Sequence, residues 1–182
     1  KTPEFKSEEE IKNIIEEIKN SECKVTDIKS TEKTVRPKPA FTTSKMQQAA
    51  ANRLGFNARK TMQIAQQLYQ GIQVGKNNVG LITYMRTDSV RIADSALEEV
   101  RQWIGKNNPD QLPPEAITYA VGKDAQDAHE AIRPTYVAYT PDDMKEYLTR
   151  DQLRLYQIIW ERFVSSQMKN AKTVTTTAEI TA

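Results

Sequence analysis

Residues 80–89 read GLITYMRTDS, and this stretch changes character halfway along its length. Its first half is rich in β-branched and aromatic residues, which predicts a short buried strand over residues 80–85. Its second half carries the hydroxyl and carboxylate groups typical of a turn or a helix start. Tyr84 therefore lies at the end of a predicted strand, two residues before Arg86. It is either a packing residue or a nucleophile presented beside a cation.

The composition is that of one ordinary domain, or of one domain with part of another. The 182 residues are 38% hydrophobic and 27% charged, and 26 Lys and Arg leave a net charge of +2 over 24 Asp and Glu. Any basic surface therefore has to arise from local clustering of Lys and Arg side chains. No apolar run approaches the roughly 20 residues of a membrane span, and no secretory signal opens the chain. The single cysteine, Cys23, excludes an internal disulfide, and no His/Cys cluster indicates zinc.

Capping residues and apolar periodicity predict a mainly α chain with a small β part. The predicted helices cover residues 8–20, a pair between Ser44 and Gly71, residues 94–104, a segment that starts at Thr140-Pro141, and a last helix capped by Thr149. In the last helix Leu153, Tyr156, Ile159, Trp160 and Phe163 are predicted to be core. The adjacent Asp142 and Asp143 are better explained as an acidic first turn than as metal ligands.

Two segments near the ends of the chain read as strands, residues 23–35 and the final TVTTTAEITA. The chain lacks an initial methionine, and its last strand has no neighbour in sequence, so it is expected to be cut from a longer polypeptide. The RPKPAF segment after the first strand is a stiff linker. Between Ser44 and Gly71, two helices flank a short turn that contains glycine, and Arg59-Lys60 opens the second. This resembles a helix-turn-helix, although helical hairpins that touch no DNA share the pattern.

Three side chains are candidates for chemistry: Tyr84, Arg86 and the only histidine, His129. A tyrosine is a weak nucleophile unless a cation stabilises its phenolate or a base takes its proton. An arginine fork can hold two phosphate oxygens as charge develops on them, and a histidine can donate to a phosphate or move a proton. The three fit phosphoryl transfer through a phosphotyrosine. On spacing alone a core tyrosine and a loop histidine are the more common explanation.

Four segments resemble signature segments of the bacterial type IA DNA topoisomerases, in that family's order. They read AFTTSKMQQAAANRLGFNARKTMQIAQQLY, GLITYMRTDS, QDAHEAIRPT and TRDQLRLYQIIWERFVSSQM. The similarity covers most of residues 37–170 and is looser before residue 37. Ala93 stands where the family often has serine, which affects a helix cap and not the chemistry.

The resemblance implies specific roles. Tyr84 would attack a phosphate of single-stranded DNA and become joined to the 5′ phosphate, Arg86 would contact the scissile phosphate, and His129 would lie near the cleavage site. Asp88 is a candidate carboxylate partner for His129. Further DNA contacts are expected from Arg53, Arg59, Lys60 and Arg133, in addition to Arg86.

The resemblance also implies an architecture. Residues 37–170 would form the helical catalytic-tyrosine domain, with a catabolite-activator-like helix-turn-helix fold, inserted into a β-rich arch domain. Residues 1–36 would be part of that arch and residues 171–182 its returning strand, so the two terminal strands should pair. The full enzyme would need Mg²⁺ held by a Toprim domain. No residue here matches that domain's acidic pattern, so no metal ligand is assigned in this chain.

The implied function is cleavage and resealing of one DNA strand, which relaxes negatively supercoiled DNA. The enzyme would act as a monomer on single-stranded and negatively supercoiled DNA, in the cytoplasm and on the nucleoid, without a membrane. The fragment alone is expected to be inactive. Two alternatives remain: a non-catalytic helix-turn-helix binding module, and a tyrosine recombinase that forms a 3′ linkage. The position of His129 after Tyr84 counts against the recombinase.

Overall fold

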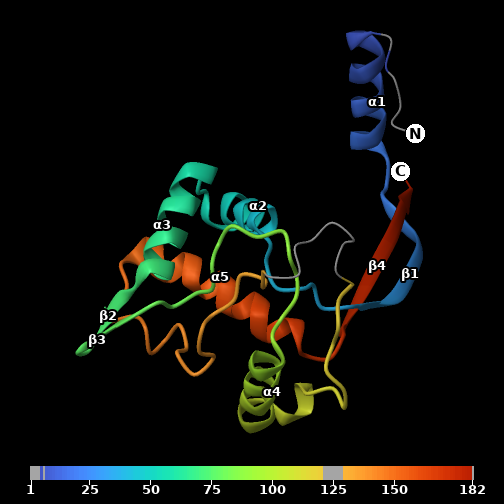
Figure 1. The fold of residues 1–182 in the computed structure, drawn as a ribbon. Helices are drawn as coiled ribbons and strands as arrows, with labels where there is room; N and C mark the ends of the chain where they lie inside the picture. The colour runs from blue at the N-terminus through green and yellow to red at the C-terminus, as the bar shows by residue number, and fades with distance from the viewer. Residues whose placement is uncertain (1–4, 6, 121–128, 182) are drawn as a thin grey trace. The chain divides into compact units, whose positions relative to one another are not determined.

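The computed structural model describes residue 5, residues 7–120 and residues 129–181. The chain divides into two compact units, one formed by Lys1–Val35 with Ala171–Ala182 and the other by Arg36–Asn170. Within the described residues there are five α-helices and two antiparallel two-stranded sheets (Figure 1). None of these helices is long and apolar enough to cross a membrane.

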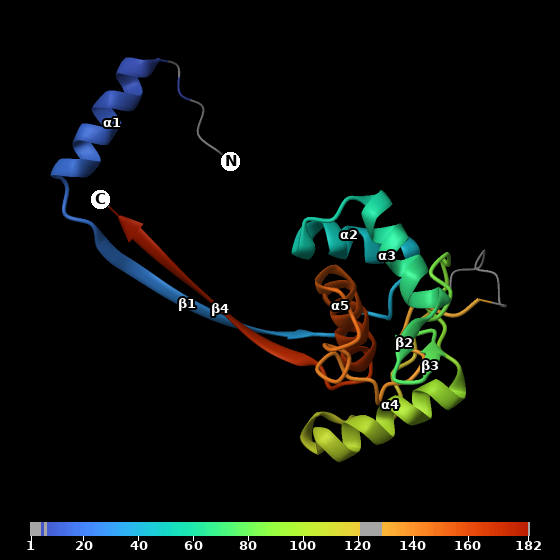
Figure 2. The same cartoon turned by 90° about the vertical axis from the view of Figure 1, so that its left-hand side faces the viewer.

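The first unit consists of one helix and one two-stranded ribbon. Helix α1 (Glu8–Asn20) has the predicted N-cap, because the Ser7 hydroxyl accepts from the Glu10 N–H at 3.2 Å. Strands β1 (Lys24–Val35) and β4 (Ala171–Thr181) pair antiparallel, with a register irregularity between Val25 and Asp27 (Figure 2). The predicted pairing of the two terminal strands is therefore confirmed. No described residue of α1, β1 or β4 is buried.

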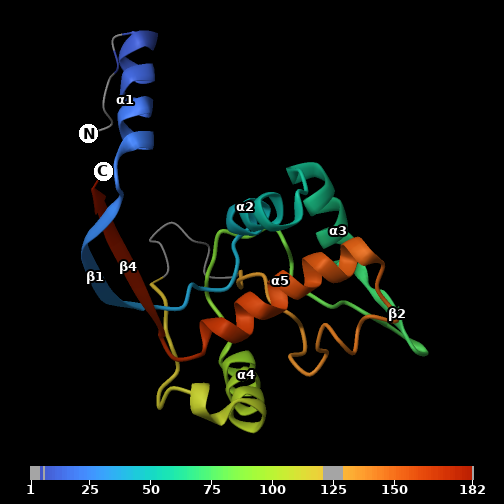
Figure 3. The same cartoon turned by 180° about the vertical axis from the view of Figure 1, so that it is seen from behind.

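The second unit is built around one long helix. Its elements are α2 (Thr43–Leu54), α3 (Ala58–Gln70), the hairpin β2 (Ile72–Val74) and β3 (Asn77–Val79), α4 (Asp94–Asn107), a 3₁₀ turn at Pro109–Gln111 and α5 (Arg150–Ser166). Helices α2 and α3 lie on one side of α5 and α4 lies on the other (Figures 1 and 3).

The core of this unit follows α5 along its length. Leu155, Tyr156 and Ile159 pack with α2, α3 and the 81–85 segment, whereas Phe163 and Val164 pack with α4. Burial of Tyr156, Ile159 and Phe163 confirms the predicted core face, while Leu153 and Trp160 are partly buried. The capping box of Thr149 with Gln152 is also confirmed.

The link between α2 and α3 is a tight turn. Helix α2 ends at Gly55, whose φ of 71° is in the left-handed region that glycine adopts without strain. Asn57 then caps α3 by accepting from the Lys60 N–H at 2.8 Å, as predicted. The predicted cap of α2 was wrong. Thr42, not Ser44, accepts the first-turn N–H, from Lys45 at 3.4 Å.

Two other local predictions were wrong. Residues 80–85 form no regular strand and make only an isolated bridge between Ile82 and Pro134. After Thr140 the chain makes a series of turns and not a regular helix, although Thr140 still accepts from the Asp143 N–H. Helix α4 extends beyond the predicted end, and Ala93 gives it no side-chain cap, as the alanine there predicts.

Candidate functional site

The Tyr84 segment is held in an extended conformation by residues 131–135. The Thr83 N–H donates to the Arg133 carbonyl at 2.9 Å, and the Thr135 N–H donates to the Leu81 carbonyl at 3.0 Å. The Thr83 hydroxyl adds two bonds, donating to the Ala131 carbonyl at 2.7 Å and accepting from the Arg133 N–H at 3.0 Å. Two stretches about fifty residues apart in sequence are thereby joined directly before the tyrosine.

Tyr84 itself is presented to solvent. Leu81, Ile82 and Met85 are at most 1% exposed, whereas Tyr84 is 41% exposed. Its ring lies 5.3 Å from the Tyr69 ring and 6.3 Å from the His129 ring, measured between ring centres. Its hydroxyl makes no hydrogen bond with the residues that the structure describes. The neighbouring residues anchor the segment, and the phenol is left available for reaction.

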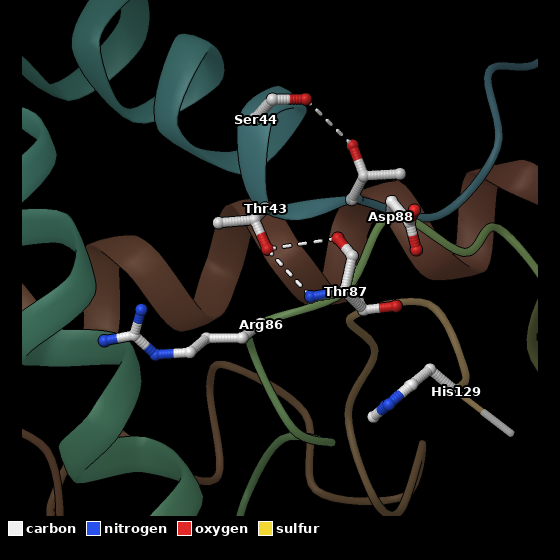
Figure 4. A pocket seen from close by; sticks show the side chains of 7 residues that line it. Thr43, Ser44, Arg86, Thr87, Asp88 and His129 are labelled. Carbon is white, nitrogen blue, oxygen red and sulfur yellow. Dashed lines mark hydrogen bonds between the residues drawn. The ribbon is translucent and has the colours of Figure 1, made fainter. Parts of the chain in front are cut away.

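A cavity of about 770 Å³ lies beside this segment. Figure 4 shows the side chains that line it, with Arg86 and His129 on either side of Thr87 in that view. The lining residues are Thr42, Thr43, Ser44, Arg86, Thr87, Asp88 and His129. They provide a guanidinium, an imidazole, one carboxylate and several hydroxyl groups. Such a set suits a phosphate group, because Arg, His and hydroxyls all donate to its oxygens.

Thr43, at the start of α2, fixes the backbone on both sides of Arg86. Its hydroxyl lies 2.8 Å from the Met85 carbonyl and 3.0 Å from the Thr87 carbonyl, and it accepts from the Thr87 N–H at 2.9 Å. Its own N–H donates to the Thr87 carbonyl at 2.9 Å. The bonds between Thr43 and Thr87 are visible in Figure 4. Together with the Thr83 bonds, they hold the Tyr84–Arg86 segment at both ends.

Asp88 and His129 line the same cavity, but no hydrogen bond or ion pair joins them within the described residues. Asp127, beside His129, lies outside the described residues. Glu130 is engaged elsewhere, since it accepts from the Ala93 N–H at 2.6 Å and pairs with Arg133 at 2.7 Å. The structure thus brings His129 to Tyr84 and to the Arg86 cavity without showing a carboxylate partner for it.

The Arg133 side chain is enclosed and bonded within the fold. Its side chain is only 12% exposed, and it also donates to the Pro134 carbonyl at 3.0 Å. Its Nε atom is buried and has no partner among the described residues. An arginine that is enclosed and paired in this way stabilises the junction of the 91–93 and 130–134 segments. The structure therefore gives no support to the predicted DNA contact of Arg133.

The other predicted DNA-binding cations lie on α2 and α3, away from the cavity lining. Arg53 pairs with Glu161 at 3.1 Å, and Lys60 pairs with Asp151 at 2.6 Å. The hydrogen bond from Lys60 lowers the pKa of Asp151. Arg59 is exposed and makes no ion pair with the part of the chain that the structure describes. Two of the three cations near the α2–α3 turn are thus partly neutralised by acids of α5.

Thr42, Thr43, Ser44 and Thr87 were missed as site residues in the sequence. The run of hydroxyl residues in AFTTSK could have indicated them. The same run predicts a helix cap, and it was interpreted only as a cap. Its contact with the 85–87 backbone is a long-range one that sequence spacing does not reveal.

The described residues do not fit a resident magnesium site. Asp88 is the single carboxylate in the cavity lining, and no group of three or more His, Cys, Asp or Glu among the described residues could hold a metal ion. Mg²⁺ is usually bound by one or two carboxylates with waters and substrate phosphates. One isolated aspartate is too small a donor set to assign a metal to the described residues.

Comparison with known proteins identifies the family. A family model described as DNA topoisomerase matches residues 1–182. The DNA topoisomerase 1 of Treponema pallidum (strain Nichols) is 58% identical over 178 residues, which are 98% of this chain and 24% of that protein. The DNA topoisomerase 1 of Rickettsia felis (strain ATCC VR-1525 / URRWXCal2) is 46% identical over 166 residues, 90% of this chain and 21% of that protein.

A solved structure agrees with these sequence relatives. The full-length topoisomerase I of Thermotoga maritima, in a monoclinic crystal form, matches with a TM-score of 0.74 at 39% identity. The match covers 98% of this chain and 28% of that one. The chain therefore spans about a quarter of the length of these relatives. It belongs to the DNA topoisomerase family.

Proposed function

We propose that this chain is the part of a type IA DNA topoisomerase that carries the attacking tyrosine, and that Tyr84 is that residue. The observation that carries the proposal is the state of the Tyr84 hydroxyl, which is exposed and has no hydrogen-bond partner among the described residues. The His129 ring lies 6.3 Å from the Tyr84 ring, and Arg86 and His129 line one cavity. A nucleophile beside two phosphate-binding side chains supports attack on a phosphodiester.

The proposed reaction is a transesterification. The Tyr84 oxygen forms a bond to the phosphorus of one DNA strand, and the bond from phosphorus to the 3′ oxygen breaks. The tyrosine loses its proton, the departing 3′ oxygen gains one, and the 5′ phosphate stays on the protein as an aryl ester. Resealing reverses these steps, because the 3′ hydroxyl attacks the ester and releases tyrosine. No phosphodiester is hydrolysed overall, so the reaction needs no ATP.

Arg86 and His129 have separate tasks in this scheme. The guanidinium of Arg86 holds two phosphate oxygens as negative charge grows on them. The imidazole of His129 donates to a phosphate oxygen from the opposite side of the cavity. Thr43 acts through Arg86 and is a positioning residue, since it bonds the backbone and not the substrate.

The proposal assigns the remaining functions to residues outside this chain. Mg²⁺, the Toprim domain that holds it and the passage of a second strand belong to the full enzyme, and relaxation of negatively supercoiled DNA requires all of them. In this proposal residues 37–170 correspond to the catalytic-tyrosine domain, and α1 with the β1–β4 ribbon corresponds to part of the arch. The full enzyme is proposed to act as a monomer on DNA in the cytoplasm.

The test is the polarity and position of the protein–DNA adduct in the full-length enzyme. A single-stranded oligonucleotide labelled at its 3′ end should leave its label on the protein, whereas a 5′ label should be released on a fragment with a free 3′ hydroxyl. Peptide mass mapping should place the nucleotide on Tyr84. The Tyr84→Phe variant should form no adduct and should still bind the oligonucleotide.

Tyr69 provides a matched control. It is 41% exposed, as Tyr84 is, and the two rings are in contact. Tyr69→Phe should leave adduct formation close to that of the unchanged enzyme. A 5′ label that stays on the protein would indicate a recombinase-like 3′ linkage, and binding without any adduct would indicate the binding module. Either result would refute the proposal.

A further inference from the structure

A second cavity adjoins the cavity that Arg86 and His129 line, and its charged lining side chains are all cations. It measures about 490 Å³ and shares Thr42 with the first cavity. Its charged lining residues are Lys38, Lys45 and Arg162, and no carboxylate of the described residues lines it. We call it the Lys38–Arg162 groove. In a chain whose charges nearly cancel, a cavity with only positive side chains is a local exception.

No acid of the described residues neutralises the three cations. None of them forms an ion pair with a described residue, in contrast to Arg53, Lys60 and Arg133. Lys45 only donates to Gln48 at 3.3 Å, and Arg162 lies over the Phe41 ring at 4.7 Å. Burial lowers the pKa of Arg162, and repulsion from Arg53 adds to this shift. A half-buried guanidinium near another cation is stabilised when an anion binds.

The groove is fixed in place from both sides. Lys45 lies on the first turn of α2, which Thr43 bonds to the Met85–Thr87 backbone. The Tyr119 hydroxyl lies 2.9 Å from both the Pro37 carbonyl and the Ser166 carbonyl. That contact holds the segment before Lys38 against the end of α5, the helix that carries Arg162. The backbone that carries the three cations is therefore tied to the segment that carries Tyr84 and Arg86 and to the end of α5.

We propose that the Lys38–Arg162 groove binds phosphates of the same single DNA strand that Tyr84 cleaves, immediately beyond the nucleotides in the cavity that Arg86 and His129 line. This rests on the proposed function, because it takes the occupant of the first cavity to be that strand. A strand that leaves the cavity past Thr42 enters a positive groove, which neutralises its phosphates. The amides of Gln48 and Asn52 in the lining can bond to base edges with little sequence preference.

Binding of a fluorescent single-stranded oligonucleotide to the full 182-residue chain, measured by anisotropy across salt concentrations, tests this. The groove variant is Lys38→Gln/Lys45→Gln/Arg162→Gln. The matched control is Lys76→Gln/Lys106→Gln/Arg150→Gln, which removes the same charge from exposed positions outside both cavities. The groove variant should bind on the order of tenfold more weakly at low salt. The slope of log K against log salt should become shallower by about 2, because each of the three lost phosphate contacts contributes about 0.7.

The control variant should keep the slope of the unchanged chain. Equal slopes for groove and control variants would overturn the inference, and so would undetectable binding by the unchanged chain at low salt. Arg162 packs on Phe41, so its loss can disturb folding. The double variant Lys38→Gln/Lys45→Gln changes only exposed side chains and should still flatten the slope by about 1.4. An unchanged slope in the double variant would also overturn the inference.

A scan of the oligonucleotide locates the contact and separates the two proposals. Single neutral methylphosphonate linkages should weaken binding at positions adjacent to the scissile phosphate, and this effect should vanish in the groove variant. A uniform effect at all positions would refute the groove. Failure of the proposed function appears differently, as the absence of a Tyr84 adduct in the full enzyme with the groove effect intact.

Discussion

Tyr84 and Tyr156 lie in the same unit and have opposite surroundings. Tyr156 on α5 is fully buried, and its hydroxyl donates to the Tyr139 carbonyl at 2.6 Å. Burial, with the nearby charge of Asp143, raises the pKa of Tyr156 well above its usual range. Tyr84 lies on an irregular segment, is 41% exposed and has no hydroxyl partner among the described residues. One phenol is held neutral by the core, and the other is presented by segments that the core anchors.

The comparison separates stability from reactivity. Changes around Tyr84 should alter cleavage and leave the fold intact, whereas changes at Tyr156 should alter stability and leave cleavage intact. A variant that slows cleavage and destabilises the fold to the same degree would show that the positioning of Tyr84 and the stability of the core are not independent.

Arg86 should give the largest effect after the tyrosine itself. In the full enzyme Arg86→Ala should slow cleavage by about 10²–10³, the loss typical of removing one preorganised donor to a developing charge. Arg86→Lys should restore only part of the rate, because an ammonium lacks the two-oxygen fork. Single-turnover cleavage of a labelled oligonucleotide measures this, with thermal melting as the stability control. Full activity of the lysine variant would contradict the fork geometry.

His129 should give the next effect. His129→Ala should lower the cleavage rate by about 10², in the range of a group that donates to or takes protons from a reacting centre. His129→Gln keeps a donor and should be milder. The melting temperature should stay unchanged in both, since the ring touches Tyr84 and not the core. Equal rates for the alanine variant and the unchanged enzyme would restrict the site to Tyr84 and Arg86.

Thr43 should have a smaller effect that depends on its hydroxyl alone. Thr43→Val keeps the shape and loses the hydroxyl bonds to Met85 and Thr87, so the backbone on both sides of Arg86 is held less firmly and cleavage should slow by about tenfold or more. Thr43→Ser should restore the rate. Thr61→Val is the control, because Thr61 is also a helical threonine whose hydroxyl bonds only to the Asn57 carbonyl. A similar rate loss in both valine variants would indicate general destabilisation.

Tyr156 should show the reverse behaviour. Tyr156→Phe leaves the Tyr139 carbonyl without its donor and should cost about 1–2 kcal/mol of unfolding free energy at neutral pH, with cleavage unchanged. Because the pKa is raised in the folded chain, the neutral phenol stabilises the fold below about pH 10, and this contribution is lost as the pH rises further. Denaturant unfolding from pH 8 upward should therefore show a flatter alkaline loss in Tyr156→Phe than in the unchanged chain.

The helices could be predicted because their signals are local. Asn57 and Thr149 cap the helices that follow them, and Tyr156 lies on an apolar face with helical period. The strand predicted at residues 80–85 was wrong, because β-branched composition indicates a buried extended segment and does not require a hydrogen-bonded ladder. That segment is extended and partly buried, but it lies against the irregular residues 131–135 and so forms only an isolated bridge.

The candidate site rests on a different kind of signal. Tyr84, Arg86 and His129 came from a resemblance over long segments, since their spacing alone fits an ordinary core. The role of Thr43 depends on contacts made across more than forty residues of sequence, which no local pattern records. The DNA contact of Arg133 stays a prediction, and the ion pair with Glu130 shows that a charged residue in a signature segment can also serve the fold.

The β1–β4 ribbon should lose its backbone hydrogen bonds more often than the second unit does. Each strand has one hydrogen-bonded neighbour within the described chain, and no described residue of either strand is buried. The ladder and cross-strand hydroxyl contacts such as Ser30 with Thr176 at 3.1 Å therefore hold the ribbon without a core. Such a ribbon opens often, so its amide hydrogens should exchange with solvent far sooner than those of α5. The backbone near Tyr84 can keep its bonds through many openings of the ribbon, because every residue of both core clusters belongs to the second unit.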